Sequence, residues 1–243
     1  MPAVQFLCTV VTMTDQLPGL RERKKADTRR ALSDAALNLA FERGLDNVTR
    51  EDIANLAGVS LRTFNNYFTG KYEALAYRQA ERMRRGLAVL RQRPANEPLW
   101  TAIAHAVLEP LEEDFADVHG DENQVPSRRE LTEVRKLLLN PQIRNAVPQQ
   151  LFDEWLEVIG ERTGTDPDRD MYPRLVVAVV RAVGDAAADS YVRADPPVAV
   201  TELIRSGFAA VSAGLPAPPR KTSHEVKSQA ARRRGGGNAR CSS

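Results

Sequence analysis

The chain has few of the residues that build cross-linked or catalytic sites. Its 243 residues include two cysteines and three histidines, and aromatic residues make up 6% of them. Cys8 and Cys241 stand near opposite ends of the sequence, which gives neither a disulfide framework nor a metal-ligand spacing. No phosphate-binding loop, dinucleotide-binding glycine pattern, or Ser-His-Asp or Cys-His arrangement is apparent. We therefore expect no metal, no cofactor and no enzymatic activity.

The sequence also lacks a hydrophobic run long enough for a membrane span. Its opening, MPAVQFLCTVVTM, is apolar but has no basic segment ahead of it, and it is shorter than the roughly 20 residues that a transmembrane helix needs. We therefore expect no signal peptide and no membrane association, and a cytoplasmic, nucleoid-associated protein. Residues 1–19 are expected to be a disordered extension or the product of an early start codon.

The residues that are abundant indicate helices. Hydrophobic residues make up 42% of the chain, and their low aromatic share is typical of an all-α protein rich in Ala and Leu. The charge is unevenly divided: residues 20–71 hold ten Lys or Arg and seven Asp or Glu, whereas residues 72–215 hold seventeen and twenty-three. Since phosphate repels an acidic surface, only the N-terminal part is suited to contact DNA.

Residues 47–71 read NVTREDIANLAGVSLRTFNNYFTGK, which predicts two short helices joined by a tight turn. Thr49 is placed as an N-cap, and the first helix would begin near Arg50 with two carboxylates in its first turn. Apolar residues at helical spacing supply its buried face, namely Ile53, Leu56 and Ala57. Gly58 then provides the reversal that a residue without a Cβ makes most easily.

The second helix would be capped by Ser60, run from Leu61 to Phe68 and stop at Thr69-Gly70. Its Arg, Thr and Asn side chains have donors and acceptors that match base edges, while tyrosine hydroxyls and lysine ammonium groups suit phosphate oxygens. This mixture indicates a DNA-reading helix-turn-helix. The alternative is that the polar side chains only face water and that the turn ends one ordinary helix.

A basic segment and an amphipathic helix precede this motif. Six cations crowd the start of the segment, namely Arg21, Arg23, Lys24, Lys25, Arg29 and Arg30. Apolar residues then recur at helical spacing until Gly44 ends the helix, namely Leu32, Ala36, Leu39 and Ala40. Through the stretches TRRALSDAALNLAFERGLDNVTREDIANLAGVS and RTFNNYFTGKYEAL, residues 21 to about 75 resemble the DNA-binding domain of the tetracycline-repressor (TetR) family of bacterial regulators.

The resemblance implies a role for each residue of the motif. The two N-cap residues would also approach phosphate, and Tyr67 and Lys71 would hold the DNA backbone. Arg62 and Thr63 would enter the major groove. The full set of DNA-binding candidates is Thr49, Ser60, Leu61, Arg62, Thr63, Asn65, Asn66, Tyr67, Lys71, Arg21, Lys24 and Lys25.

Asn65 departs from the family's pattern, because many members place an aromatic ring at its position. An asparagine side chain can pair with N6 and N7 of adenine, which a ring cannot do, so the operator preference would be shifted. The alternative is that Asn65 is only a spacer.

The remainder predicts a helical body over residues 72–215. Expected helices cover residues 71–92, 99–118 with a kink at Pro110, a stretch near 128–139, a segment from Leu151, and residues 171–193 and 197–214. The last two resemble the helices that form the dimer's four-helix bundle in this family, and small residues on one face permit close approach, namely Ala178, Ala182 and Ala186. Reading two half-sites about 34–36 Å apart also requires a homodimer.

In this family a cavity in the body binds a small effector, whose entry swings the long linking helix. The candidate lining residues are Trp100, His105, Phe115, Phe152 and Trp155, although each could be ordinary core. The resemblance therefore implies a homodimeric repressor that binds double-stranded operator DNA and responds to a small molecule. The alternatives are a regulator without an effector, whose body serves only to dimerise, and an all-helical enzyme.

Residues 216–243 carry seven basic residues and one acidic residue and are rich in Pro, Gly and Arg. Because this composition cannot form a packed core, we expect a disordered basic tail. Arg232, Arg233 and Arg234 could add nonspecific attraction to phosphate or be a solvated run. The expected boundaries are thus residues 1–19, 20–71, 72–215 and 216–243.

Overall fold

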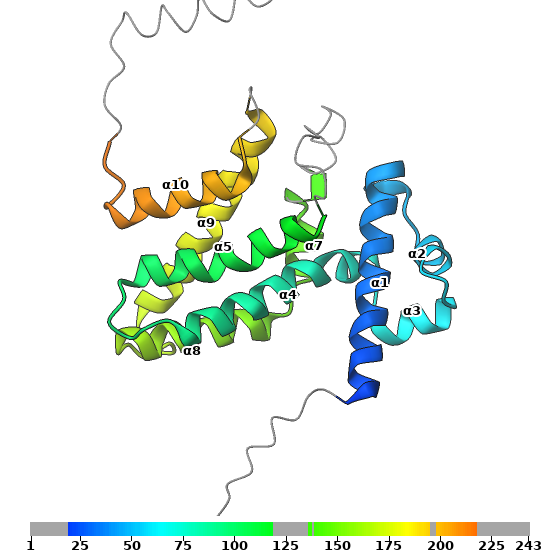
Figure 1. Cartoon of the computed structure of the whole chain (residues 1–243), viewed down its shortest axis with the longest axis horizontal. Coiled ribbons are helices and arrows are strands. Elements are labelled where there is room, and N and C mark those ends of the chain that lie inside the picture. The colour runs from blue at the N-terminus through cyan, green and yellow to red at the C-terminus, as the bar shows by residue number, and fades with distance from the viewer. Residues whose placement is uncertain (1–18, 119–135, 138, 195–197, 218–243) are drawn as a thin grey trace, which may run out of the picture.

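The computed structural model describes residues 19–118, 136–137, 139–194 and 198–217, without the side chains of residues 115–118. Every regular element in this part of the chain is helical, so the all-α prediction is confirmed (Figure 1). The elements are α1 (Leu20–Arg43), the 3-10 turn η1 (Leu45–Asn47), α2 (Arg50–Leu56), α3 (Leu61–Tyr67), α4 (Lys71–Gln92), α5 (Leu99–Val118), α7 (Pro141–Asn145), α8 (Gln149–Thr163), α9 (Met171–Arg193) and α10 (Val200–Ser212).

Helices α1, α2 and α3 with the first turn of α4 form one unit, which we call the reading head (Figure 1). Its core gathers the apolar faces of all four helices, and Leu32, Ile53 and Phe64 in it are fully buried. The α2–turn–α3 arrangement is the predicted helix-turn-helix. Gly58 makes the turn at φ +68°, a conformation that side chains with a Cβ rarely adopt.

The predicted helix boundaries in the reading head are confirmed at the two N-caps. Thr49 accepts a hydrogen bond from the amide of Asp52, and the carboxylate of Asp52 accepts one from the amide of Thr49, which completes a capping box. Leu56 was wrongly predicted to be buried: its residue is 53% exposed. The stripe fails there because α2 ends at this residue and only Ile53 and Ala54 of the helix are buried.

Helix α4 connects the reading head to the body. Its N-terminal turns carry Ala74 and Leu75 into the core of the head, and its C-terminal half carries Leu87 and Leu90 into the core of the body. The helix stops before Pro94, as predicted. Arg162 of α8 donates hydrogen bonds to three carbonyl oxygens at that end, those of Leu90, Arg93 and Pro94.

The body packs α4, α5, α8, α9 and α10 around a second core (Figure 1). Helices α4 and α5 make the most extensive contact, at a point where Gly86 lies against the backbone of Ala106. Helix α5 continues through Pro110, and α9 spans residues 171–193 as predicted. Of the stretch predicted near 128–139, only Lys136, Leu137 and Leu139 are described, and they are helical.

No helix in the described ranges is long and apolar enough to cross a membrane. The predicted extension and tail fall outside those ranges, apart from Gly19 and residues 216–217. The four domain boundaries therefore stay predictions.

Candidate nucleic-acid interface

The start of α3 is fixed by a local pair of hydroxyl side chains. Ser60 Oγ accepts a hydrogen bond from the amide of Thr63 at 3.0 Å and lies 2.9 Å from Thr63 Oγ1. The first turn of the helix is therefore held without a partner from elsewhere in the chain. Leu61 and Thr63 are half-buried beside this cap, whereas Arg62 is exposed.

The outer face of α3 presents polar side chains because its inner face is anchored. Phe64 is fully buried, and this places Arg62, Asn65 and Asn66 on the exposed side of the helix. No hydrogen bond or ion pair within the described residues engages the side chains of Arg62 and Asn66. Arg62 and Asn66 thus have free donors, and Asn66 also a free acceptor, of the kind that base edges match.

Asn65 has a neighbour that the sequence did not suggest. Arg50 of α2 donates a long hydrogen bond of 3.5 Å from Nη1 to Oδ1 of Asn65. Arg50 and Asn65 are thereby brought together from the two helices of the motif, and both are exposed. Arg50 is a further candidate for the DNA-facing surface that helical periodicity alone could not have identified, because the pair is fifteen residues apart.

Lys71 makes contacts inside the reading head that the sequence did not suggest. Its ammonium group donates to the carbonyl oxygens of Leu45 at 2.9 Å and Val48 at 3.0 Å, and it lies 5.5 Å from the ring centre of Tyr72. Two of its three donors are thus used inside the reading head. Lys71 therefore ties α4 to the segment ahead of α2, and because one donor is left, its contact with phosphate stays a prediction.

Tyr67 is also engaged. It is half-buried at the end of α3, and the guanidinium of Arg29 lies 5.8 Å from its ring centre, a cation–π arrangement between α3 and α1. Sequence reasoning placed Arg29 only among the basic residues of the N-terminal segment. The contact could not be found from spacing because it joins two helices.

The N-cap Thr49 is exposed, and its hydroxyl donates to Oδ2 of Asp52 at 2.6 Å. The side-chain and backbone hydrogen bonds from Thr49, aided by the nearby charge of Arg43, hold the pKa of Asp52 below its ordinary value. Asp52 is therefore ionised at neutral pH, and its negative charge lies at the N-terminus of α2, where it complements the helix dipole.

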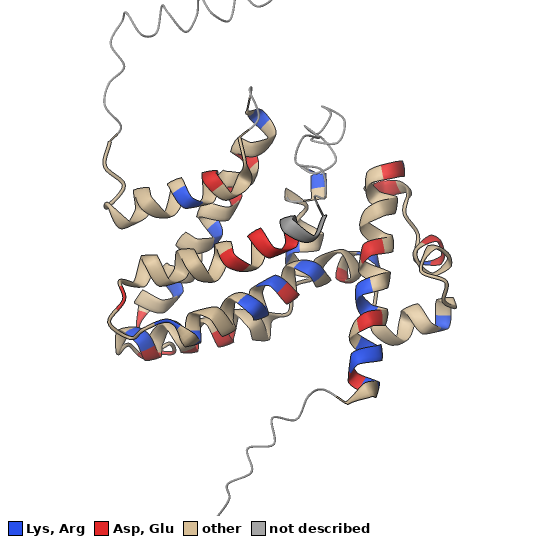
Figure 2. Cartoon of the chain, in the orientation of Figure 1, with Lys and Arg blue, Asp and Glu red and all other residues tan. Residues whose placement is uncertain are grey.

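The basic candidates ahead of the motif lie on the first two turns of α1 (Figure 2). Arg21, Lys24 and Lys25 are exposed, and none has an ion pair within the described residues. Lys25 lines a cleft toward α4, whereas Arg21 and Lys24 are not among the residues that line it. These cations are suited to contact phosphate oxygens without reading sequence.

Each of the four described candidates for an effector pocket has a partner within the chain. Trp155 is buried in the body's core and donates from Nε1 to the carbonyl of Met83, while Trp100 stacks on Phe208 with ring centres 6.5 Å apart. His105 bonds Glu109 at 2.9 Å, and Phe152 lies beneath the guanidinium of Arg181. The side chain of Phe115 is outside the described residues. None of these side chains lines either of two cavities found among the described residues.

Two family models match the chain. Residues 32–76 match the model of bacterial regulatory proteins of the tetR family, and residues 97–216 match the MftR C-terminal domain. The HTH-type transcriptional regulator TcmR of Streptomyces glaucescens is 33% identical over 183 residues, which cover 73% of this chain and 79% of that protein.

Two further relatives extend the comparison. The regulator named MftR of Mycobacterium tuberculosis is 26% identical over 196 residues, covering 79% of this chain and 93% of that one. The solved structure of the fatty acid degradation regulator FadR from Bacillus halodurans superposes with a TM-score of 0.50 at 20% identity, over 79% of this chain and 97% of that chain. This last likeness shows the fold alone.

Proposed function

Because the chain belongs to the tetracycline-repressor (TetR) family of bacterial regulatory proteins, we propose that this transcriptional regulator is a homodimeric repressor. The reading head binds double-stranded operator DNA in the cytoplasm, and a small-molecule effector releases it. The observation that carries the proposal is the capped α2–turn–α3 unit, whose α3 is anchored by buried Phe64 and exposes Arg62, Asn65 and Asn66.

In this proposal the DNA contacts divide into two kinds. Arg62 and Asn66, together with the Arg50–Asn65 pair, read base edges in the major groove. Arg21 and Lys24 on α1 attract phosphate and carry no sequence information. The division is supported by the position of each side chain, since the first group lies on α3 or beside it and the second lies on another helix.

The division of roles is tested with an operator selected from random DNA by the wild-type protein. Arg62→Ala should select a broader or different sequence. Lys24→Ala should select the same sequence and lower the slope of log affinity against log salt by about one phosphate contact. If Arg62→Ala keeps the wild-type preference, α3 is not the reading helix.

Dimerisation is supported by an uncovered stripe on α9. Met171 is 74% exposed and Leu175 is 49% exposed, and Ala178, Ala182 and Ala186 continue the same face and are exposed as well. Apolar and small residues on one face of a long helix allow a second helix to approach closely. No described residue of the chain covers this stripe, whereas the opposite face of α9 packs into the body's core.

A charge in this stripe tests the dimer. Ala182→Glu would leave an unpaired carboxylate between two closely packed helices, which costs several kcal/mol, about enough to separate a dimer of ordinary affinity. Ala88→Glu, on the exposed side of α4, is the matched control. Sedimentation should show monomers for Ala182→Glu only, with weakened operator binding. A dimeric Ala182→Glu variant would place the interface elsewhere.

The effector part of the proposal is supported by family membership. The competing reading is a body that only dimerises, in which the four described pocket candidates serve as packing residues with the partners given above. Operator binding that changes with a small molecule would decide for an effector. Binding that no small molecule alters would decide for the dimerising body.

A further inference from the structure

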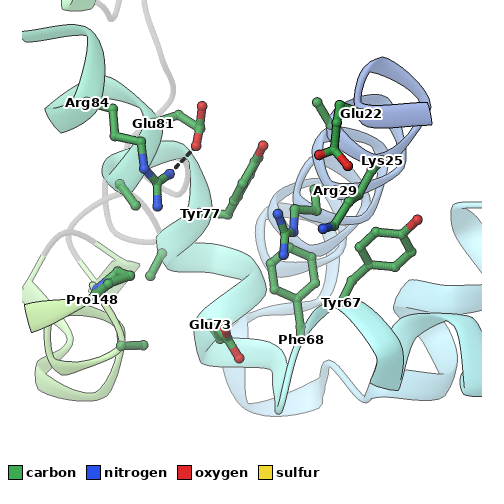
Figure 3. A pocket seen from close by; sticks show the side chains of 14 residues that line it. Glu22, Lys25, Arg29, Tyr67, Phe68, Glu73, Tyr77, Glu81, Arg84 and Pro148 are labelled. Carbon is green, nitrogen blue, oxygen red and sulfur yellow. Dashed lines mark hydrogen bonds and ion pairs between the residues drawn. The ribbon is translucent and has the colours of Figure 1, made fainter. Parts of the chain in front are cut away.

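A cleft of about 490 Å³ lies where the reading head meets the body (Figure 3). One wall is the N-terminal half of α1, and the other is α4, with the end of α3 and the α7–α8 connection closing the sides. The volume is within the range of small-molecule sites. A molecule held here would contact both the head and the body at once.

The floor of the cleft is apolar and aromatic, and six charged side chains line its walls. Its floor includes Phe68, Ala76 and Ala80, which are at most 4% exposed. The ring of Tyr77 stands edge-on to that of Phe68 with centres 5.8 Å apart, and Tyr67 faces the cleft from the end of α3. Small floor residues between aromatic rings leave room for a flat ring system.

Three of the six charged side chains that line the cleft already have a partner. Glu81 forms an ion pair with Arg84, and the carboxylate of Glu73 accepts hydrogen bonds from the amide and hydroxyl of Thr69. Figure 3 shows the remaining cations, Lys25 and Arg29, ending toward the same opening from α1.

Lys25 and Arg29 are the cations with unused donors. Within the described residues neither has a hydrogen bond or ion pair, and Arg29 lies over the ring of Tyr67. These two side chains, one turn apart on α1, can receive an anionic group through charge-assisted hydrogen bonds. Glu22 lies one turn before Lys25 on the same wall, and its charge disfavours a ligand with a second negative group.

We propose that this cleft binds a planar aromatic monoanion, such as an aromatic carboxylate or phenolate. The ring system lies against Phe68 and Tyr77, and the anionic group pairs with Lys25 and Arg29. The site names a place and a ligand class for the effector, and in that respect it rests on the function proposed above.

The position of the cleft connects the ligand to DNA binding. Below the cleft, Arg78 of α4 donates to Asp34 of α1 at 2.8 Å, which fixes the two helices to each other at that level. A ligand that binds both walls can therefore shift the N-terminal half of α1, where the cations proposed to contact phosphate lie, relative to α4. It also takes Lys25 away from phosphate.

The test is calorimetric titration of the full chain with 2-naphthoate and with its neutral analogue 2-naphthamide. The wild-type protein should bind naphthoate at one site per chain and at least about tenfold more tightly than naphthamide. Lys25→Met should remove that preference, and Tyr77→Leu should weaken both ligands. Lys24→Met is the matched control, because this exposed lysine does not line the cleft, and it should bind like the wild type.

Circular dichroism checks that each variant is folded, and Lys25 is exposed, so its replacement leaves the core intact. Naphthoate that binds the wild type, Lys25→Met and Tyr77→Leu equally, or that does not bind the wild type at millimolar concentration, overturns the cleft as the site. Operator binding is measured separately. Naphthoate bound in the cleft without any change in operator affinity supports the site and contradicts the effector proposal. Operator release by naphthoate that persists in Lys25→Met and Tyr77→Leu supports the effector proposal and contradicts the site.

Discussion

Replacing Gly86 by alanine should push α4 away from α5 and destabilise the body. A Cβ at this position would come closer to the carbonyl oxygen of Ala106 than real Cβ atoms come to any neighbour, and it would lie 3.3 Å from Cζ2 of Trp155. The obstructing oxygen belongs to the backbone of α5, so it cannot rotate away. Helix α4 must therefore move outward by roughly 1 Å to restore an ordinary contact distance.

The size of the effect follows from two opposing contributions. Overpacking a close-packed core costs about 1–3 kcal/mol, and a clash with backbone belongs at the upper end of that range. Alanine gains about 1 kcal/mol over glycine inside a helix. The net loss for Gly86→Ala is therefore about 2 kcal/mol of unfolding free energy. For a chain of this length that lowers the melting temperature by roughly 4–8 °C.

Gly184 provides a control of opposite sign. It also lies inside a helix, α9, but no atom stands within 4 Å of the place its Cβ would take. Gly184→Ala should raise the stability by up to about 1 kcal/mol. Urea unfolding and calorimetry compare the two variants under the same conditions. If both substitutions shift stability in the same direction, the close contact between α4 and α5 is not what glycine provides at position 86.

Three further predictions concern side-chain contacts. Thr49→Ala should lower the free energy of unfolding at neutral pH by about 1 kcal/mol, the usual contribution of an N-cap. Because Thr49 holds the pKa of Asp52 below its ordinary value, urea unfolding should show a smaller difference from the wild type as the pH falls below about 4. A difference that stays constant with pH would contradict this. Lys71→Met should lower the free energy of unfolding by about 1–3 kcal/mol, because two carbonyl oxygens lose their donor, and should leave the slope of log operator affinity against log salt unchanged. A slope reduced by about one would show that Lys71 contacts a phosphate. Asp114→Asn should lower the free energy of unfolding measured in urea by about 1–3 kcal/mol, because the guanidinium groups of Arg82 and Arg85 both pair with this carboxylate, whose side chain is 20% exposed. A loss under about 0.5 kcal/mol would show that water replaces the carboxylate as their partner.

The features that the sequence predicted well are set by neighbours along the chain. The caps at Thr49 and Ser60, the turn at Gly58 and the span of α9 each depend on residues within a few positions, so spacing and residue type contain the necessary information. These caps and this turn form through local hydrogen bonds and backbone geometry, which tertiary packing does not override.

The features that it missed depend on contacts between distant segments. Lys71 reaches carbonyls 23 and 26 residues earlier, and Trp155 donates to a carbonyl 72 residues away. A lysine next to a helix start is equally compatible with a phosphate and with a backbone carbonyl, because both are oxygen acceptors. Only the tertiary structure shows that the carbonyl oxygens of Leu45 and Val48 lie within reach of this ammonium group. The burial of Leu56 was mispredicted because periodicity indicates which face of a helix is buried but not the residue at which the helix ends, and α2 ends at Leu56.

The contacts of α4 explain how a change in one core would reach the other. The helix spans 22 residues, about 33 Å, and is tied at its start by Lys71 and held near its middle by the pairing of Arg82 and Arg85 with Asp114. Its end is held by Arg162, so α4 is bound to the body along its second half. The reading head is therefore tied to α4, and the Asp34–Arg78 pair holds α1 to the same helix. The N-terminal half of α1 precedes this pair and contacts the head through Arg29 and Tyr67, so a ligand in the junction cleft that changes this contact needs to break none of the carboxylate–guanidinium pairs of the body.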